Sequence, residues 1–365
     1  MKRILLSVGV LLLSMNAIKA QTKAETSKVV AITVDGLRWQ ELFSGADAKL
    51  VENKKYVDNP KRLKTEFWRE NPQERRAILM PFVWGEVIKM GQIHGNRNLG
   101  SYVNLTNNMW FSYPGYNEIL TGKADDERIT SNEKINNPNV TFLERLQNTS
   151  DYKGKIAAFG SWDVFPYIIN EERSGIPVNA GFKTAKGDSL SQKELFLNEL
   201  QPEVPSPWNS VRLDAFTAGY AIEYMKRKHP EVVYVAFGET DDFAHDGEYD
   251  SYLKAARNTD GLIKKLYDFT QQDDFYKDNT VFIISTDHGR GEKPIDDWRN
   301  HGRKINGADQ VWMIVFGQGV EVLGEVSSEE RLFSNQIAPT VLEILNKPEL
   351  GENMEGKSLK LQIKS

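Results

Sequence analysis

Short apolar runs alternate with longer amphipathic stretches along most of the chain. The apolar runs are rich in β-branched residues and end at polar residues or glycine, which is typical of buried strands. We expect strands over residues 28–34, 155–159, 232–237, 280–285 and 311–316. Apolar positions at helical spacing predict helices over residues 214–228, 249–269 and 335–345. This alternation predicts an α/β fold with a mostly parallel central sheet and helices on both faces.

Acidic residues follow three of the predicted strands. Asp35 comes directly after the first strand, Asp287 comes shortly after "VFIIS", and Asp241 lies four residues beyond Phe237. Ligands of parallel sheets gather beyond the carboxyl ends of the strands, where loops present side chains without disturbing the core. We therefore expect these three carboxylates at one edge of the sheet.

Three of the five histidines lie beside these acids or shortly after them. His245 stands four residues after Asp241, a spacing that puts both on one side of a helical turn. His288 follows Asp287 directly, and His301 precedes the last predicted strand. Each residue alone also suits a structural role, such as a turn aspartate or a surface imidazole. Together, three Asp and three His are sufficient to bind two cations, and mixed carboxylate and imidazole ligands favour zinc.

The stretch "NMWFSYPGYNEILTG" places Ser112 just before Pro114 and an apolar run. This pattern predicts that a helix begins at Ser112, so free backbone N–H groups would face a bound phosphate. Ser112 then fits two roles, that of an ordinary N-cap residue and that of a nucleophile. The sequence shows no Ser, His and acid relay around it, so direct coordination to a cation would activate the hydroxyl. The two roles are compatible.

The length of 365 residues and the 40% hydrophobic content are ample for a large core. We expect one catalytic domain over residues 21–365, with polar insertions or a cap around 46–80 and 171–210. No internal repeat or low-complexity tract interrupts it.

Residues 1–20 have the layout of a secretory signal peptide, with two basic residues, a short apolar run and Ala20 at the expected cut. The net charge is −5, and cleavage would remove three basic residues and no acid, which argues against stable nucleic-acid binding. No other apolar segment is long enough to span a membrane after cleavage. The chain has no cysteine, which excludes disulfides and a cysteine-linked lipid anchor. We expect a periplasmic or secreted protein.

Six motifs occur in a characteristic order: "VDG", "FSYPGYNEILTG", "TDDFAH", "TDHGRG", "NHG" and "IAPTVLEIL". In this the chain resembles the alkaline phosphatase superfamily, and within it the nucleotide pyrophosphatase/phosphodiesterase-like branch. The resemblance implies an alkaline phosphatase-like domain with two Zn²⁺ ions, or Mn²⁺ as the alternative. It implies that one ion is bound by Asp241, His245 and His301 and the other by Asp35, Asp287 and His288, with Ser112 as the metal-bound nucleophile. Asp242 does not keep the four-residue spacing to His245.

The activity that the resemblance implies is hydrolysis of phosphate mono- or diesters of a small phosphorylated substrate. Ser112 would attack phosphorus, and water would hydrolyse the resulting phosphoserine. A sulfatase is disfavoured because Tyr116 stands where the S-x-P-x-R motif needs arginine. Two alternatives remain open: a phosphonate hydrolase or phosphotransferase on the same site, and a non-catalytic binder of a phosphorylated ligand or glycan.

Several neighbouring residues have no settled role at the sequence level. The branch often uses an asparagine to hold a phosphoryl oxygen, and four candidates follow the nucleophile: Asn132, Asn136, Asn137 and Asn139. Three basic residues lie near the metal motifs and are expected to be exposed charges: Arg290, Arg303 and Lys304. Aromatic residues around Ser112 suit either a stacking platform or the core, with the core favoured for Phe111: Trp110, Phe111, Tyr113 and Tyr116.

Overall fold

The computed structural model describes residues 27–359 and residue 361. The predicted signal peptide, residues 1–20, lies outside the described residues. The strands in the described part are β1 (Lys28–Val34), β2 (Gly91–His94), β3 (Val103–Asn104), β4 (Ile156–Gly160), β5 (Val178–Ala180), β6 (Val232–Phe237), β7 (Thr280–Ser285), β8 (Gln310–Val311), β9 (Met313–Gly317), β10 (Gly324–Glu325) and β11 (Leu332–Phe333). The α-helices are α1 (Trp39–Ser44), α2 (Pro60–Phe67), α3 (Pro72–Leu79), α4 (Pro81–Gly85), α5 (Ser112–Thr121), α6 (Phe142–Gln147), α7 (Phe165–Ile168), α8 (Glu171–Ser174), α9 (Gln192–Leu200), α10 (Asp214–Lys228), α11 (Glu239–Asp246), α12 (Tyr249–Gln272) and α13 (Ile337–Ile344).

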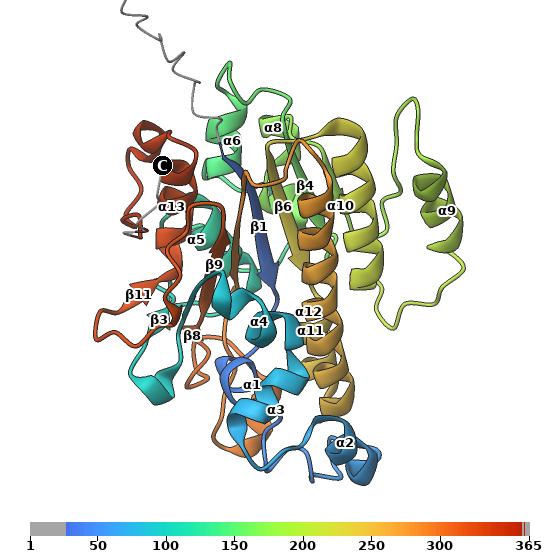
Figure 1. The fold of residues 1–365 in the computed structure, drawn as a ribbon, viewed down its shortest axis with the longest axis vertical. Coiled ribbons are helices and arrows are strands. Elements are labelled where there is room, and N and C mark those ends of the chain that lie inside the picture. Colours follow the sequence, from blue (N-terminus) through green and yellow to red (C-terminus); the bar gives the residue numbers. More distant parts are fainter. Residues whose placement is uncertain (1–26, 360, 362–365) are drawn as a thin grey trace, which may run out of the picture.

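A large sheet forms the centre of the molecule (Figure 1). Its eight strands run in the order β10-β2-β9-β7-β1-β6-β4-β5. Strand β1 pairs in parallel with both β6 and β7, and β4 continues the parallel arrangement on the β6 side. Strand β9 pairs antiparallel with both of its neighbours, β7 and β2. The predicted α/β class with a mostly parallel sheet is confirmed.

Alternating side chains of β1 enter two different hydrophobic clusters. Val30, Ile32 and Val34 pack in one cluster with α10 and α12, whereas Val29 and Ala31 pack in the other with α5 and α13. Because successive strand residues point to opposite faces, an uninterrupted apolar strand needs cover on both sides. Figure 1 shows α10 and α12 on one side of the strands and α5 and α13 on the other. All seven residues of β1 are buried, as this arrangement requires.

The predicted boundaries agree closely for the central elements. Strands β1, β6 and β7 and helix α10 have the predicted limits. The strand expected over 311–316 is interrupted at Trp312, whose indole N–H donates to the carbonyl of Leu37. The range predicted as an insertion around 46–80 contains α2 and α3, and the range around 171–210 contains α8, β5 and α9.

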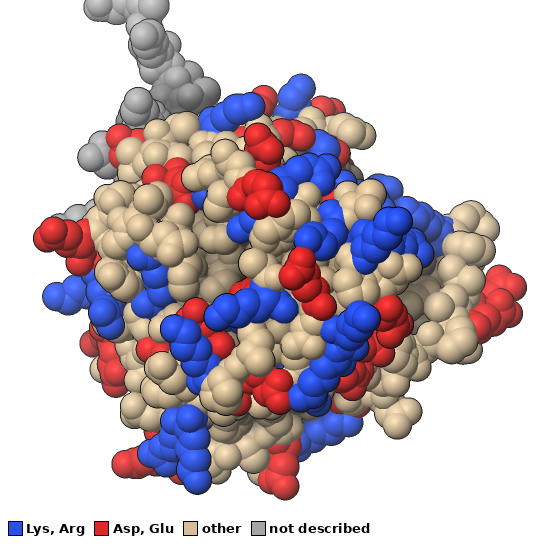
Figure 2. Space-filling model, turned by 90° about the horizontal axis from the view of Figure 1, so that it is seen from below, with Lys and Arg blue, Asp and Glu red and all other residues tan. Residues whose placement is uncertain are grey.

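No helix in the described part of the chain is long and apolar enough to cross a membrane. The face in Figure 2 carries acidic and basic side chains interspersed, with no extended basic surface.

The buried side chain of His94, at the end of β2, is expected to make the stability of the fold sensitive to acid. Burial lowers the pKa of its imidazole from 6.5 to about 4. A depressed histidine pKa means that stability is complete above pH 6.5 and is lost as the pH falls, because the unfolded chain takes up the proton first. Each pH unit between these two values costs about 1.4 kcal/mol, so this group removes about 2 kcal/mol between pH 7.5 and pH 5.

Urea unfolding of wild type and His94→Gln at these two pH values measures this contribution. We expect the loss of unfolding free energy on acidification to be smaller in the variant by about that amount. An identical loss of unfolding free energy in both proteins would show that His94 does not cause the acid sensitivity.

Candidate functional site

The carboxyl ends of the three central strands bring the predicted acids together. Asp35 directly follows β1, and Asp287 lies two residues beyond β7. Asp241 lies in the first turn of α11, which begins just after β6. Because β6, β1 and β7 are adjacent and parallel, their ends meet at one edge of the sheet.

His288 stands at the centre of this group. Its Nε2 atom lies 3.3 Å from Asp35 Oδ1, 3.5 Å from Asp287 Oδ2 and 3.6 Å from Asp241 Oδ1. Asp287 and His288 are completely buried, and Asp35 is only 5% exposed. Asp35, Asp287 and His288 form one group with metal-ligand spacing, the set that the resemblance implies.

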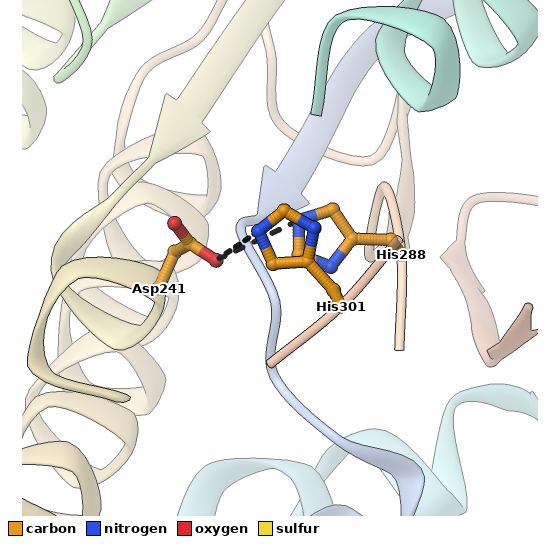
Figure 3. A group of neighbouring side chains, drawn as sticks. All are labelled: Asp241, His288 and His301. Carbon is orange, nitrogen blue, oxygen red and sulfur yellow. Dashed lines mark ion pairs between the residues drawn. The ribbon is translucent and has the colours of Figure 1, made fainter. Parts of the chain in front are cut away.

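A second, more open group surrounds Asp241 (Figure 3). The Nε2 atom of His301 lies 3.8 Å from Asp241 Oδ1, and the rings of His288 and His301 stack with centroids 3.9 Å apart. Asp241, His288 and His301 have metal-ligand spacing. His245 adjoins them, with its Nε2 2.9 Å from His301 Nε2 and 3.3 Å from Asp241 Oδ2. The His245 side chain is 44% exposed, so this group faces solvent.

Two observations fit a divalent cation at the group of Asp35, Asp287 and His288. The buried atoms Asp35 Oδ1 and Asp287 Oδ2 have no hydrogen-bond partner, and such atoms are normally satisfied. The Nδ1 atom of His288 lies 3.0 Å from the carbonyl of Gly289 and can donate to it, which leaves a lone pair on Nε2 toward the carboxylates. The donor set of carboxylates and imidazoles suits zinc. The assignment of each residue as a ligand stays a prediction.

The pKa shifts in the site reflect burial and the close spacing of its charged groups. Burial, and then Asp35, raise the pKa of Asp287 well above its ordinary value. Burial lowers the pKa of His288, but Asp287 and Asp35 outweigh it and raise that pKa to about 9. Burial, with neighbouring positive groups, lowers the pKa of His301 well below its ordinary value. Closely packed buried carboxylates repel one another unless a cation lies between them.

Ser112 faces this centre from the first position of α5. The helix begins at Ser112 as predicted, but its N-cap is Phe111, so the interpretation of Ser112 as a capping serine is wrong. Ser112 Oγ lies 3.4 Å from His288 Nε2 and the residue is only 4% exposed. A Cβ atom at Gly115 would lie 2.1 Å from the carbonyl oxygen of Asp287, so glycine permits α5 to approach the metal-motif loop.

Sequence reasoning did not identify two residues that hold Asp35. The hydroxyl of Tyr116 donates to Asp35 Oδ2 at 2.8 Å, and the hydroxyl of Thr240 donates to the backbone carbonyl of Asp35. Tyr116 is completely buried and Tyr113 is 2% exposed, so both belong to the core rather than to a platform. Trp110 and Phe111 are half-buried, and the expectation of a core position for Phe111 is not met.

The structure distinguishes the four asparagine candidates. Asn137 and Asn139 are buried and donate to Asn117, and Asn136 donates to Glu172. Asn132 is exposed, and its Oδ1 accepts from the backbone N–H of Tyr113 at 3.0 Å. It is therefore the candidate whose contact adjoins Ser112.

The basic residues near the motifs differ from one another. Arg303 and Lys304 are exposed, as expected. Arg290 is only 1% exposed and contacts Asp241, so its interpretation as an exposed charge is wrong. Asp242 is half-buried, and the metal-spaced groups found among the described residues do not include it.

Comparisons with known proteins show a family match that includes part of this site. Residues 209–349 match the family model of the Metalloenzyme superfamily, and this range contains Asp241, His245, Asp287, His288 and His301. The 2,3-bisphosphoglycerate-independent phosphoglycerate mutase of Ureaplasma urealyticum is 34% identical over 119 residues, which are 32% of this chain and 21% of the relative. The match thus spans about a fifth of that relative's length.

Solved structures show the same fold over nearly the whole chain. The alkaline phosphatase PafA aligns with a TM-score of 0.57 at 12% identity, over 93% of this chain and 99% of that one. The phosphonate monoester hydrolase SpPMH from Silicibacter pomeroyi aligns with a TM-score of 0.56 at 14% identity, over 92% and 76% of the two chains. The chain therefore has an alkaline phosphatase-like fold, as the resemblance predicts. The pyrophosphatase/phosphodiesterase-like branch stays a prediction.

Proposed function

We propose that this protein is an exported two-metal phosphohydrolase that cleaves phosphate mono- or diesters through Ser112. The observation that carries the proposal is the convergence of Ser112 with both groups. Ser112 Oγ lies 3.4 Å from His288 Nε2, and that nitrogen lies within 3.6 Å of all three predicted aspartates. Zn²⁺ is the proposed ion because of the ligand types, and the signal-like residues 1–20 support export.

Two divalent cations, when bound, would supply Lewis-acid stabilisation of the attacking and leaving oxygens. The chain itself supplies the nucleophile and the phosphate site. Ser112 begins α5, so its own backbone N–H and the positive end of the helix face the substrate. Tyr113 already donates its N–H to Asn132, and Pro114 has none. Asn132 accepts the Tyr113 N–H through Oδ1, and its amide N–H groups are the proposed donors to a phosphoryl oxygen.

The reaction then proceeds in two displacements. Ser112 Oγ gives its proton to solvent and forms a bond to phosphorus while the bond to the leaving alcohol breaks, and that alcohol takes a proton from solvent. Water next attacks the phosphoserine, breaks the Oγ–P bond and restores the hydroxyl, which releases phosphate from a monoester or a phosphate monoester from a diester. The exposed side of His245 is the side from which water can reach the centre.

A phosphotransferase is the second candidate. The partial similarity to a phosphoglycerate mutase favours it. Such an enzyme would use the same Ser112 and differ only in the acceptor of the phosphoryl group, which would be an alcohol in place of water.

The test is metal analysis combined with a substrate panel. We expect purified protein to carry close to two metal equivalents and to hydrolyse a nitrophenyl phosphate monoester or diester faster than a nitrophenyl phosphonate. With the monoester, release of nitrophenol without equal inorganic phosphate, in the presence of an alcohol, would favour the phosphotransferase. Metal binding without turnover of any panel member would contradict both and favour a non-catalytic binder.

A further inference from the structure

Arg290 contacts three separate segments from one buried position. Its Nε donates to the carbonyl of Gly36 at 3.1 Å, and its Nη1 donates to the carbonyl of Arg299 at 2.6 Å. Its Nη2 donates to the carbonyl of Asp241 at 3.1 Å and to the Asp241 carboxylate. The side chain itself is completely buried.

Each of these segments carries a candidate metal ligand. Gly36 follows Asp35, Arg299 precedes His301 by two residues, and Asp241 is itself a candidate. Arg290 in turn lies two residues after His288. One guanidinium therefore joins the four segments that supply the six predicted Asp and His ligands.

The charge of Arg290 complements its surroundings. Its guanidinium, a permanent cation at neutral pH, contacts the Asp241 carboxylate. A buried positive charge beside three clustered carboxylates reduces their repulsion before any cation binds.

Arg290 does not contact the substrate in this arrangement. Its contacts with Gly36, Arg299 and Asp241 occupy all three of its nitrogens, and only 1% of the residue is exposed. A bound phosphate therefore cannot displace these contacts without opening the loops. Its role must be exerted through the ligands that it holds.

We propose that Arg290 is a positioning residue that holds the ligand-bearing segments in register and thereby determines the metal affinity of the centre. The proposal rests on the two-metal function proposed above. Mutation of a residue that hydrogen-bonds to metal ligands typically lowers the metal affinity 10–100-fold. Lysine cannot replace arginine here, because a single ammonium cannot reach three separated carbonyls.

The packing around Gly36 strengthens this expectation. A Cβ atom at Gly36 would lie 2.8 Å from both Arg290 Nη2 and Asp241 Oδ1, so the three groups are in close contact. Gly36 also has a φ of +58°, a conformation that L side chains rarely adopt. The loop after β1 is thus shaped to receive the guanidinium.

Arg212 provides a matched control. It is also completely buried, and burial lowers its pKa to about 9. Its guanidinium donates to Asn179 and Thr217 and contacts none of the candidate ligands. Arg212→Lys therefore imposes a similar loss of buried hydrogen bonds away from the centre.

The experiment compares wild type, Arg290→Lys and Arg212→Lys by titrating metal-free protein with Zn²⁺ against a chromophoric chelator. We expect Arg290→Lys to bind Zn²⁺ about 10–100-fold more weakly and Arg212→Lys to stay within about twofold of wild type. At saturating Zn²⁺, turnover of the nitrophenyl ester by Arg290→Lys should return to within about tenfold of wild type. If Arg290→Lys is unfolded without metal, the Zn²⁺ concentration at which it folds replaces the titration.

Equal Zn²⁺ affinity in the two lysine variants would overturn the proposal. So would a loss of turnover in Arg290→Lys that saturating Zn²⁺ does not restore, because that result would assign Arg290 a direct role in the reaction. Failure of the proposed function appears separately, as a wild type that binds fewer than two ions or turns over no panel substrate.

Discussion

Replacing Ser112 with alanine is expected to reduce kcat/KM for phosphate esters by at least about 10³-fold while leaving both cations bound. This loss corresponds to about 4 kcal/mol of transition-state stabilisation. The expectation follows from geometry, because Ser112 Oγ is the hydroxyl placed at the helix start, 3.4 Å from His288 Nε2. The six other candidate ligands stay in place, so metal content should be close to that of wild type. Stopped-assay kinetics and metal analysis of the same preparation measure both effects.

Ser285→Ala is a suitable control for this variant. Ser285 is also buried and ends β7, two residues before Asp287, but its hydroxyl donates to the carbonyl of Trp312 at 2.7 Å. It should keep activity within about tenfold of wild type, because its hydroxyl bonds a carbonyl and lies outside the proposed mechanism. Full activity in Ser112→Ala would exclude the phosphoserine route, and loss of metal from that variant would show that Ser112 mainly anchors a cation.

The central elements were predictable because their signal is local. Strands β1, β6 and β7 are continuous apolar runs that are buried on both faces, so hydrophobicity alone marks their limits. The short strands at or near the sheet edges are different. β2 contains only Gly91–His94. Gly91 packs against the backbone of β9, and no sequence pattern predicts this contact. Such strands are defined by their partners more than by their own residues.

The candidate ligands were predictable for a related reason. Asp35 and Asp287 lie just past buried strands, and the sheet topology brings those strand ends together. The residues that support them were not predictable, because their contacts join distant segments. Tyr116 reaches Asp35 across 81 positions, and Arg290 reaches Gly36 across 254. Composition and spacing describe neither contact.

Asp287→Asn is expected to have opposite effects on the thermal stability of the metal-free and the metal-bound protein. Without metal, Asp287 is a buried carboxylate whose pKa is raised well above its ordinary value by burial and by Asp35. Its Oδ2 atom has no hydrogen-bond partner, whereas Oδ1 accepts from the N–H of Gly36 at 3.1 Å. Asparagine keeps that acceptor and removes a negative charge from the cluster. The metal-free variant should therefore unfold at a temperature equal to or above that of metal-free wild type at pH 7.5.

With metal bound, wild type should have a higher unfolding temperature than Asp287→Asn. A cation present at a thousandfold excess over its Kd stabilises a protein by about 4 kcal/mol, and an amide oxygen is a weaker ligand than a carboxylate. Zn²⁺ should therefore raise the unfolding temperature of wild type much more than that of Asp287→Asn, and the variant should lose most of its turnover. Thermal unfolding of both proteins with chelator and with Zn²⁺ provides the four values. A variant that is less stable than wild type with chelator, and stabilised equally by Zn²⁺, would mean that Asp287 serves the fold and does not hold a cation.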